Sequence, residues 1–195
     1  MYSNTVKLFV AFFASSDWQQ KIEKLKNAFP LVRGMKWVPG KNIHLTVFFM
    51  GEVTGTKIDS LRAELREVAL KNKPFELVFD GFTAAPPDRP STMLWAKFKP
   101  SGEFNLLARD LKKALMSVTI LDEEHRIPTP HLTIARYKEG TNIGELNISM
   151  KDPIFKANEM ILVHADLRHD DADYKIIERY KLSSQRPLLS EKEAY

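Results

Sequence analysis

The chain has 195 residues, of which 44% are hydrophobic, so it is long enough to bury a core as one large domain or as two small lobes. It contains no cysteine, which excludes disulfides, thiolate metal sites and thiol nucleophiles, and no segment approaches the ~20 apolar residues of a membrane-spanning helix; we expect a cytoplasmic monomer with no membrane and no obligate protein partner. The net charge of +4 fits a polyanionic partner, but the lysines and arginines are scattered, so charge alone is weak evidence for nucleic acid.

Apolar patterning along the chain predicts strands interrupted by three helices. Runs of the strand type occupy residues 6–13, 43–49, 75–79, 93–98, 130–135, 158–166 and 174–182. Apolar residues recur at helical spacing over residues 18–29, 58–68 and 104–118, and serines suited to N-caps precede the first and third of these helices. A proline-bearing loop at residues 84–90 is the expected crossover between lobes. Residues 1–182 are expected to form one bilobal domain, followed by a polar tail at 183–195.

The order of these elements contains an internal repeat. His44 and His131 are 87 positions apart, and the same offset carries the first strand onto the strand at 93–98 and the first helix onto the helix that follows it. It also carries the strand at 75–79 into the strand at 158–166. Four elements share one offset, so a duplicated unit explains the order, and we expect an α+β fold of two similar lobes related by a pseudo-two-fold axis.

The repeat contains the same motif twice. His44-Leu45-Thr46 and His131-Leu132-Thr133 both lie at the start of a strand-type run. Because side chains alternate between the faces of a strand, the histidine and the threonine of each motif share one face, and the leucine packs on the other. Two lobes related by the repeat would bring both motifs to their interface. We therefore expect two histidines and two hydroxyls around one site.

These residue types suit the metal-free cleavage of a phosphodiester. One group must deprotonate the attacking oxygen and another must protonate the leaving oxygen, and imidazole, with an unperturbed pKa of ~6.5, can do either. His44 and His131 on opposite sides of one phosphorus atom would allow in-line displacement. Thr46 and Thr133 are short, stiff hydroxyl donors that could hold the phosphate oxygens. A single such motif is more often structural, so the argument depends on the pair.

Other polar residues give weaker signals. His125 lies in a charged loop, His164 is of a structural type, and His169 lies in an acidic turn, at residues 169–173, whose spacing matches no known set of metal ligands. We expect no metal and no cofactor. Arg136 follows the second motif and could bind a phosphate, although strict alternation places it opposite His131, so either it lies where the strand ends or twists or its role is structural.

Aromatic residues near the motifs could stack on a base. Phe48, which shares the face of His44 by strict alternation, is the first candidate, and Trp37 and Tyr137 are weaker ones. For Trp18 and Trp95 we expect a place in the core.

With these residues in view, the chain resembles the 2H phosphoesterases, a superfamily defined by two His-x-Thr motifs, and within it the bacterial and archaeal RNA 2',3'-cyclic phosphodiesterase (2'-5' RNA ligase) family. The resemblance is carried by Lys7-Leu8-Phe9-Val10-Ala11, by residues 42–52 and 130–136, by Leu94-Trp95-Ala96 and by Tyr174. It implies a bilobal α+β fold in which two antiparallel sheets with flanking helices surround a groove.

The resemblance also implies an activity and roles for its residues. The activity is hydrolysis of RNA 2',3'-cyclic phosphate ends to 2'-phosphates, with 2'-5' joining of RNA ends in reverse. His44 is then the proton donor, His131 the proton acceptor, and Thr46 and Thr133 bind the phosphate. Two alternatives stay open: another 2H activity, on a small cyclic nucleotide or an ADP-ribose cyclic phosphate, and an RNA-end binding protein without turnover.

Overall fold

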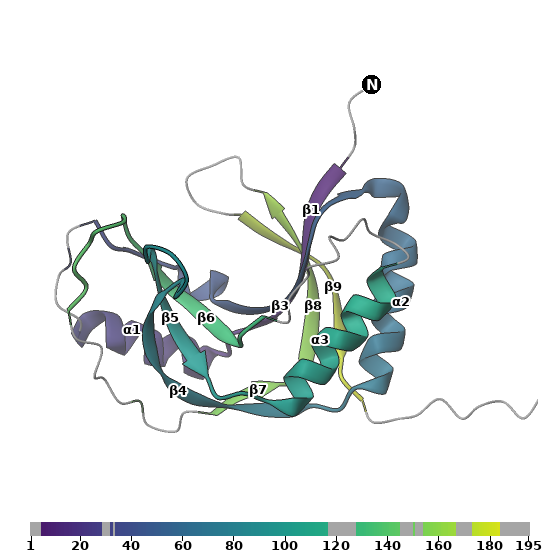
Figure 1. Ribbon diagram of the computed structural model, residues 1–195. Coiled ribbons are helices and arrows are strands. Elements are labelled where there is room, and N and C mark those ends of the chain that lie inside the picture. The colour runs from purple at the N-terminus through teal and green to yellow at the C-terminus, as the bar shows by residue number, and fades with distance from the viewer. Residues whose placement is uncertain are drawn as a thin grey trace, which may run out of the picture.

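The computed structural model describes residues 5–28, 32, 34–116, 128–144, 150, 154–166 and 173–183, and the fold is stated for these (Figure 1). The helices are α1 (Ser16–Ala28), α2 (Ile58–Lys71) and α3 (Gly102–Leu115), with two short 3-10 turns at Gly40–Asn42 and Gly55–Lys57. The strands are β1 (Thr5–Phe13), β2 (Lys36–Trp37), β3 (His44–Thr54), β4 (Phe75–Ala85), β5 (Met93–Phe98), β6 (His131–Arg136), β7 (Ile154–Ala157), β8 (Glu159–Asp166) and β9 (Asp173–Lys181).

The strands form two antiparallel sheets. The first has the order β3-β1-β8-β9 and the second the order β2-β6-β5-β4-β7. Apart from the added edge strand β2, the two orders correspond position by position, and the pairs β1 with β5, β3 with β6 and β8 with β4 are those that the offset of 87 relates in sequence. The predicted α+β class with two antiparallel sheets and a pseudo-two-fold repeat is therefore confirmed.

Each half supplies the helix that covers the other half's sheet. Helix α1 follows β1 of the first sheet, yet its Trp18 packs on Phe79, Phe98 and Phe155 of the second sheet. Helix α3 follows β5 of the second sheet but contacts α2 and β3 of the first. In Figure 1, α2 and α3 lie together beside β8 and β9, and α1 lies on the opposite side near β5 and β6. This exchange ties the two halves into one apolar core.

Local sequence explains where these helices begin. The predicted N-cap of α3 is present, because the Oγ of Ser101 accepts a hydrogen bond of 3.1 Å from the backbone N–H of Phe104. Ser15 does the same for the N–H of Trp18, at 3.4 Å, and the indole N–H of Trp18 donates to the carbonyl of Ile154. Trp18 is 2% exposed, so its predicted place in the core is confirmed. No described helix is long and apolar enough to cross a membrane.

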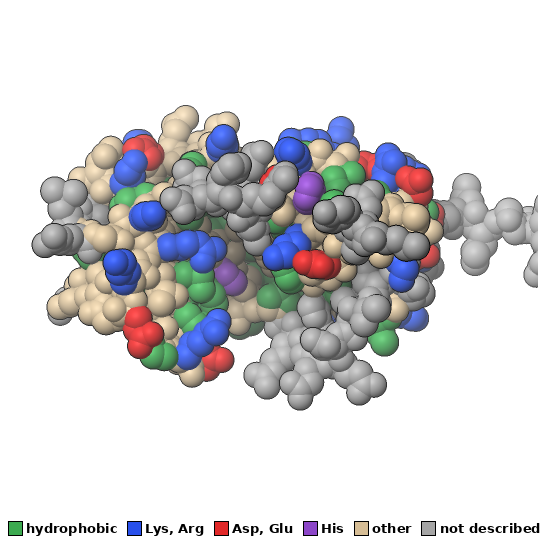
Figure 2. Space-filling view, turned by 90° about the horizontal axis from the view of Figure 1, so that it is seen from above, with side chains coloured by type: hydrophobic (Ala, Val, Ile, Leu, Met, Phe, Trp, Pro, Cys, Tyr) green, Lys and Arg blue, Asp and Glu red, His purple; other side chains and the backbone are tan. Residues whose placement is uncertain are grey.

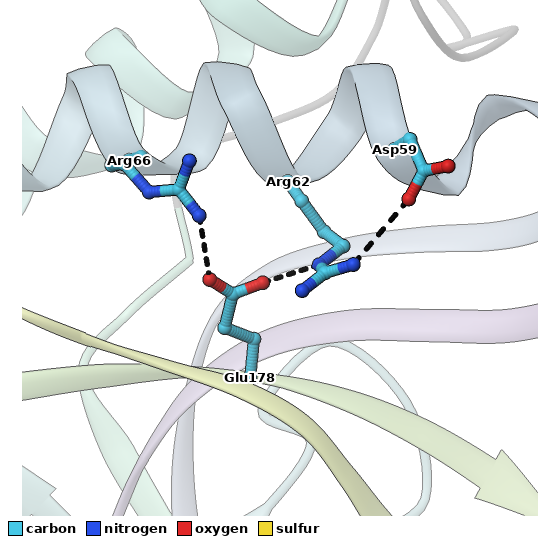
Figure 3. Close-up of polar contacts among 4 residues, drawn as sticks. All are labelled: Asp59, Arg62, Arg66 and Glu178. Carbon is cyan, nitrogen blue, oxygen red and sulfur yellow. Dashed lines mark hydrogen bonds and ion pairs between the residues drawn. The ribbon is translucent and has the colours of Figure 1, made fainter.

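An ion-pair network joins α2 to the outer strand β9 (Figure 3). The carboxylate of Glu178 accepts hydrogen bonds from the guanidinium groups of Arg62 and, at 2.9 Å, Arg66. Arg62 also pairs with Asp59 at 3.4 Å. The hydrogen bond from Arg62 lowers the pKa of Glu178 below its usual value. Since both arginines are partly exposed, solvent screens these pairs and they add little to stability.

Some expectations differ in extent or lie outside the described residues. Strand β4 runs to Ala85, well past the predicted end at residue 79, and β2 and β7 were not predicted. The proposed tail, 183–195, stays a prediction: Leu182 is buried, the N–H of Ser183 donates to the carbonyl of Ala69, and 184–195 are not described. His125 and most of the acidic turn with His169 also lie outside the described ranges.

Candidate active site

A β-bulge follows the threonine of each motif. On β3, Val10 pairs with Phe48 and Ala11 with Thr46, so Val47 is an extra residue; on β6, Leu94 pairs with Ala135 and Trp95 with Thr133, so Ile134 is extra. An extra residue reverses the alternation of side chains beyond it. The histidine and threonine of each motif keep one face, as predicted, but the residues that directly follow the extra residue change sides.

The bulges reassign two of the predicted site residues. Arg136 comes onto the face of His131 and Thr133, which removes the difficulty that strict alternation raised for it. Phe48 turns into the core, where it is 3% exposed, and the predicted stacking role of Phe48 is wrong for this reason. Beyond the bulge the exposed side chain is that of Phe49, which is 50% exposed. Phe49 lies 87 positions before Arg136, at the equivalent place in the repeat.

The two histidines are held in the same way by equivalent backbone groups. The Nδ1 of His44 lies 2.7 Å from the carbonyl oxygen of Asn42, and the Nδ1 of His131 lies 2.7 Å from that of Thr129. A carbonyl oxygen can only accept, so Nδ1 carries the proton in each ring. Nε2 is thereby left in each ring as the nitrogen that can exchange a proton with a ligand.

The aromatic surroundings of the two histidines differ. Phe9 and Phe13 lie 4.9 and 5.5 Å from the ring of His44 between centroids, and Tyr174 meets it edge-on at 5.0 Å. The imidazole of His131 instead stacks face to face on the indole of Trp95, with 3.6 Å between centroids and 18° between planes. Trp95 was predicted to lie in the core, and this prediction is wrong, because its side chain is partly exposed and packs against the ring of His131. The electron-rich face of an indole favours an imidazolium above it.

Both motifs line one cleft between the sheets. The cleft has a volume of about 210 Å³ and is lined by Lys36, Trp37, Val38, Pro39, Asn42, His44, Thr46, His131, Thr133, Arg136 and Tyr174. The short strand β2 forms part of the wall of the cleft. Its residues Lys36 and Trp37 precede the first motif in sequence, yet they pair with the end of β6, which carries the second motif. Figure 2 shows a hollow between the two halves, with a histidine side chain deep inside it and lysine and arginine side chains on both sides.

Comparison with known proteins identifies the family. A model described as the 2'-5' RNA ligase superfamily matches residues 13–155. The chain belongs to the 2'-5' RNA ligase superfamily. The matched segment contains both motifs, Trp95 and Arg136. The predicted resemblance is therefore confirmed.

Curated members of the superfamily resemble the chain over much of its length. The RNA 2',3'-cyclic phosphodiesterase of Aquifex aeolicus is 25% identical over 183 residues, which cover 91% of this chain and 97% of the relative. That of Archaeoglobus fulgidus is 29% identical over 134 residues, covering 68% and 73%.

Solved structures of similar fold support the architecture. The protein TT0787 of Thermus thermophilus superposes with a TM-score of 0.77 at 24% identity, covering 92% of this chain and all of that one. LigT of E. coli, solved in complex with phosphate, superposes with a TM-score of 0.71 at 20% identity, covering 93% and 99%. At these identities the comparison bears on the fold alone.

In this superfamily member both motif histidines are neutral at pH 7 when the cleft holds no ligand. The pKa of His44 is lowered to about 4, mainly by burial and to a smaller extent by the nearby His131 and Arg136, while the hydrogen bond to the Asn42 carbonyl opposes the shift. Burial also lowers the pKa of His131 below its usual value. A bound anion would oppose these effects, because a negative charge near an imidazole favours its protonated form.

The remaining predicted aromatics have different outcomes. Trp37 lies in the cleft wall, where a base could reach it. Tyr137 does not: it is 6% exposed, and its hydroxyl donates a 3.0 Å hydrogen bond to the carbonyl of Met93, so its proposed stacking role is wrong. Its side chain anchors the end of β6 to the start of β5 instead. Among the described residues, no three histidine or carboxylate side chains gather as a metal site requires.

Tyr174, Lys36 and Trp95 lie at the site, although no pattern in the sequence predicted a role for them there. Tyr174 comes from β9 and reaches His44 across the sheet, a contact that no local pattern reveals. Burial raises the pKa of its phenol, so the hydroxyl stays protonated and can donate to a ligand. The repeat does not predict the place of Trp95, because the offset of 87 relates it to Leu8, which pairs with Gly51, whereas Trp95 pairs with Thr133 of the second motif.

Proposed function

We propose that this protein is an RNA 2',3'-cyclic phosphodiesterase that hydrolyses cyclic phosphate ends to 2'-phosphates without a metal. One observation carries the proposal: two histidines, each with Nδ1 bound to a backbone carbonyl, line one small cleft together with two threonines and an arginine. Binding alone does not require two groups that exchange protons near neutral pH. General acid and base catalysis of a displacement at phosphorus does.

The catalytic steps use only groups of this chain. His131 Nε2 takes a proton from water as the water oxygen bonds to phosphorus, and His44 Nε2 gives a proton to the 3' oxygen as its bond to phosphorus breaks. Thr46 and Thr133 donate hydrogen bonds to the non-bridging oxygens, and the Arg136 guanidinium balances their charge. A 5'-hydroxyl in place of water would give a 2'-5' linkage by the same steps.

The surroundings of the two histidines agree with the roles that the family resemblance implies. A low pKa makes the imidazolium of His44 a strong acid, which suits a proton donor. His131 becomes positively charged when it accepts a proton, and the indole of Trp95 lies flat against it where that charge appears. The lack of cysteine fits the reducing cytoplasm that we propose as the compartment of this protein.

The experiment that tests this function is turnover after metal removal. EDTA-treated protein should hydrolyse a short RNA ending in a 2',3'-cyclic phosphate at the rate of the untreated protein, because no step uses a metal. Parallel assays use 2',3'-cyclic AMP and ADP-ribose cyclic phosphate. Hydrolysis of a small cyclic phosphate but not of RNA would favour the alternative 2H activity, and tight binding of RNA without any turnover would favour the binding protein.

The rate should also depend on pH in a characteristic way. The reactive form needs His44 protonated and His131 neutral, and in the free protein both pKa values lie below 6.5. As pH falls from 8 to 6.5, kcat/KM should therefore rise, about tenfold per unit, because more of His44 is protonated. Between the two pKa values the gain in protonated His44 is offset by the loss of neutral His131, so kcat/KM should level off, and below the lower of the two pKa values it should fall.

Saturating substrate shifts this profile. The bound phosphate anion raises both histidine pKa values, so the maximum of kcat should lie at higher pH than the maximum of kcat/KM. Measuring both parameters from pH 4 to 9 at constant ionic strength checks this. A kcat/KM that is flat between pH 6.5 and 8.5 would contradict the need for a protonated His44.

A further inference from the structure

A second, larger cavity adjoins the catalytic cleft. This second cavity has a volume of about 560 Å³, against about 210 Å³ for the cleft, and the two share Asn42 and Tyr174 in their walls. Pockets that enclose a ligand of nucleotide size usually measure ~300–1,000 Å³. The volume of the second cavity lies within this range and that of the cleft lies below it, so the second cavity is the one of the two with room for a further nucleotide.

The second cavity combines apolar rings with cations. Its aromatic side is Phe13 and Tyr174, which flank the ring of His44. Its cationic side is formed by Lys41, Lys156 and Arg179. Arg179 is paired with Glu159 at 2.9 Å, whereas no ion pair within the described ranges involves Lys41 or Lys156, both of which are exposed. Two positive charges are thus available to a ligand.

The lining matches single-stranded RNA better than it matches an acidic peptide. Unpaired bases stack on aromatic rings, phosphates pair with lysines, and base edges bond to amides. The second cavity offers all three, because the side-chain amide of Asn158 also lines it. An acidic peptide would use the cations but not the rings.

We propose that the second cavity binds the nucleotides that precede the cyclic phosphate end, with Lys41 and Lys156 on their phosphates and Phe13 and Tyr174 against a base. This inference rests on the proposed function. The polynucleotide leaves the terminal ribose through its 5' oxygen, and the second cavity adjoins the catalytic cleft at Asn42 and Tyr174. The protein would then select an RNA end over a cyclic mononucleotide.

The test compares two substrates with the same terminal nucleoside: 2',3'-cyclic AMP and a trinucleotide that ends in adenosine 2',3'-cyclic phosphate. The intact protein should prefer the trinucleotide in kcat/KM by about tenfold or more, mainly through KM, since only the trinucleotide gains the phosphate contacts of the two lysines together with a stacked base. The double variant Lys41→Gln, Lys156→Gln should lose most of this preference and keep its rate on the mononucleotide. The slope of log kcat/KM against log salt for the trinucleotide should fall by up to ~1.4.

The matched control is the double variant Lys71→Gln, Lys113→Gln. These lysines line a separate depression on α2 and α3, away from the groove, so this variant loses the same charge but should keep the preference. Equal kcat/KM for both substrates in the intact protein would overturn the proposal. So would an equal loss on both substrates in the Lys41, Lys156 variant.

A binding measurement separates this proposal from the proposed function. A fluorescent trinucleotide with an uncleavable 3'-phosphate should bind the intact protein and the control variant alike, and the Lys41, Lys156 variant more weakly by about tenfold. If neither cyclic phosphate is hydrolysed but this difference appears, the catalytic function fails and the RNA site stands. Equal binding to all three proteins would overturn the RNA site.

Discussion

Replacing either motif histidine should nearly abolish hydrolysis of the cyclic phosphate. We expect His44→Ala and His131→Ala each to lower kcat by about 10²–10⁴-fold, the usual contribution of a positioned general acid or base. The two residues act in one step, so the double variant should be little slower than the worse single variant. Initial rates on the cyclic phosphate trinucleotide measure all three.

The histidine variants need a control for folding, because alanine leaves a gap beside Trp95 or Phe9. His44→Gln and His131→Gln keep most of the volume and can hydrogen-bond, but they carry no proton near neutral pH. They should be as slow as the alanine variants while unfolding near the temperature of the intact protein. A His131→Gln variant that keeps most of its turnover would show that this ring is not the base.

Removing the motif hydroxyls should have the next largest effect. Thr46→Val and Thr133→Val replace a hydroxyl with a methyl group of similar size, so each removes one donor to the phosphate with little change of shape. We expect each to lower kcat by about 10²–10³-fold, as loss of one preorganised donor commonly does. Steady-state kinetics on the same trinucleotide give kcat and KM separately.

The matched controls are Thr46→Ser and Thr133→Ser, which keep the hydroxyl and lose only the methyl group. These should stay within about tenfold of the intact protein. A serine variant as slow as the valine variant would mean that the threonine acts through packing of its strand. Equal activity of valine and threonine would remove the hydroxyl from the mechanism.

The parts of this structure that sequence could predict are those that local patterning controls. The strand alternation around His44 and His131 placed each histidine with its threonine, and the offset of 87 gave the correspondence of the two sheets. The Ser101 cap and the apolar stripe of α3 were also sufficient to locate that helix.

The errors have one main physical source, the bulges after the two motifs. A bulge depends on how a strand pairs with its neighbour, so the order of apolar residues on β3 does not predict that Val47 is the extra residue of a bulge. Phe48 was therefore assigned to the cleft and lies in the core, while Arg136, a predicted phosphate-binding residue, lies in the cleft although strict alternation put it on the opposite face. The contact of Trp95 with His131 depends on the pairing of β5 with β6 for the same reason.

The most direct test of two-histidine catalysis in this cleft is the identity of the product. EDTA-treated protein is incubated with the cyclic phosphate trinucleotide, and the monoester formed is identified as the 2'- or the 3'-phosphate by phosphorus NMR. If His44 protonates the 3' oxygen while His131 activates water on the opposite side of the phosphorus, the product is the 2'-phosphate alone. A 3'-phosphate, a mixture of the two, or turnover only after metal is restored would contradict the account.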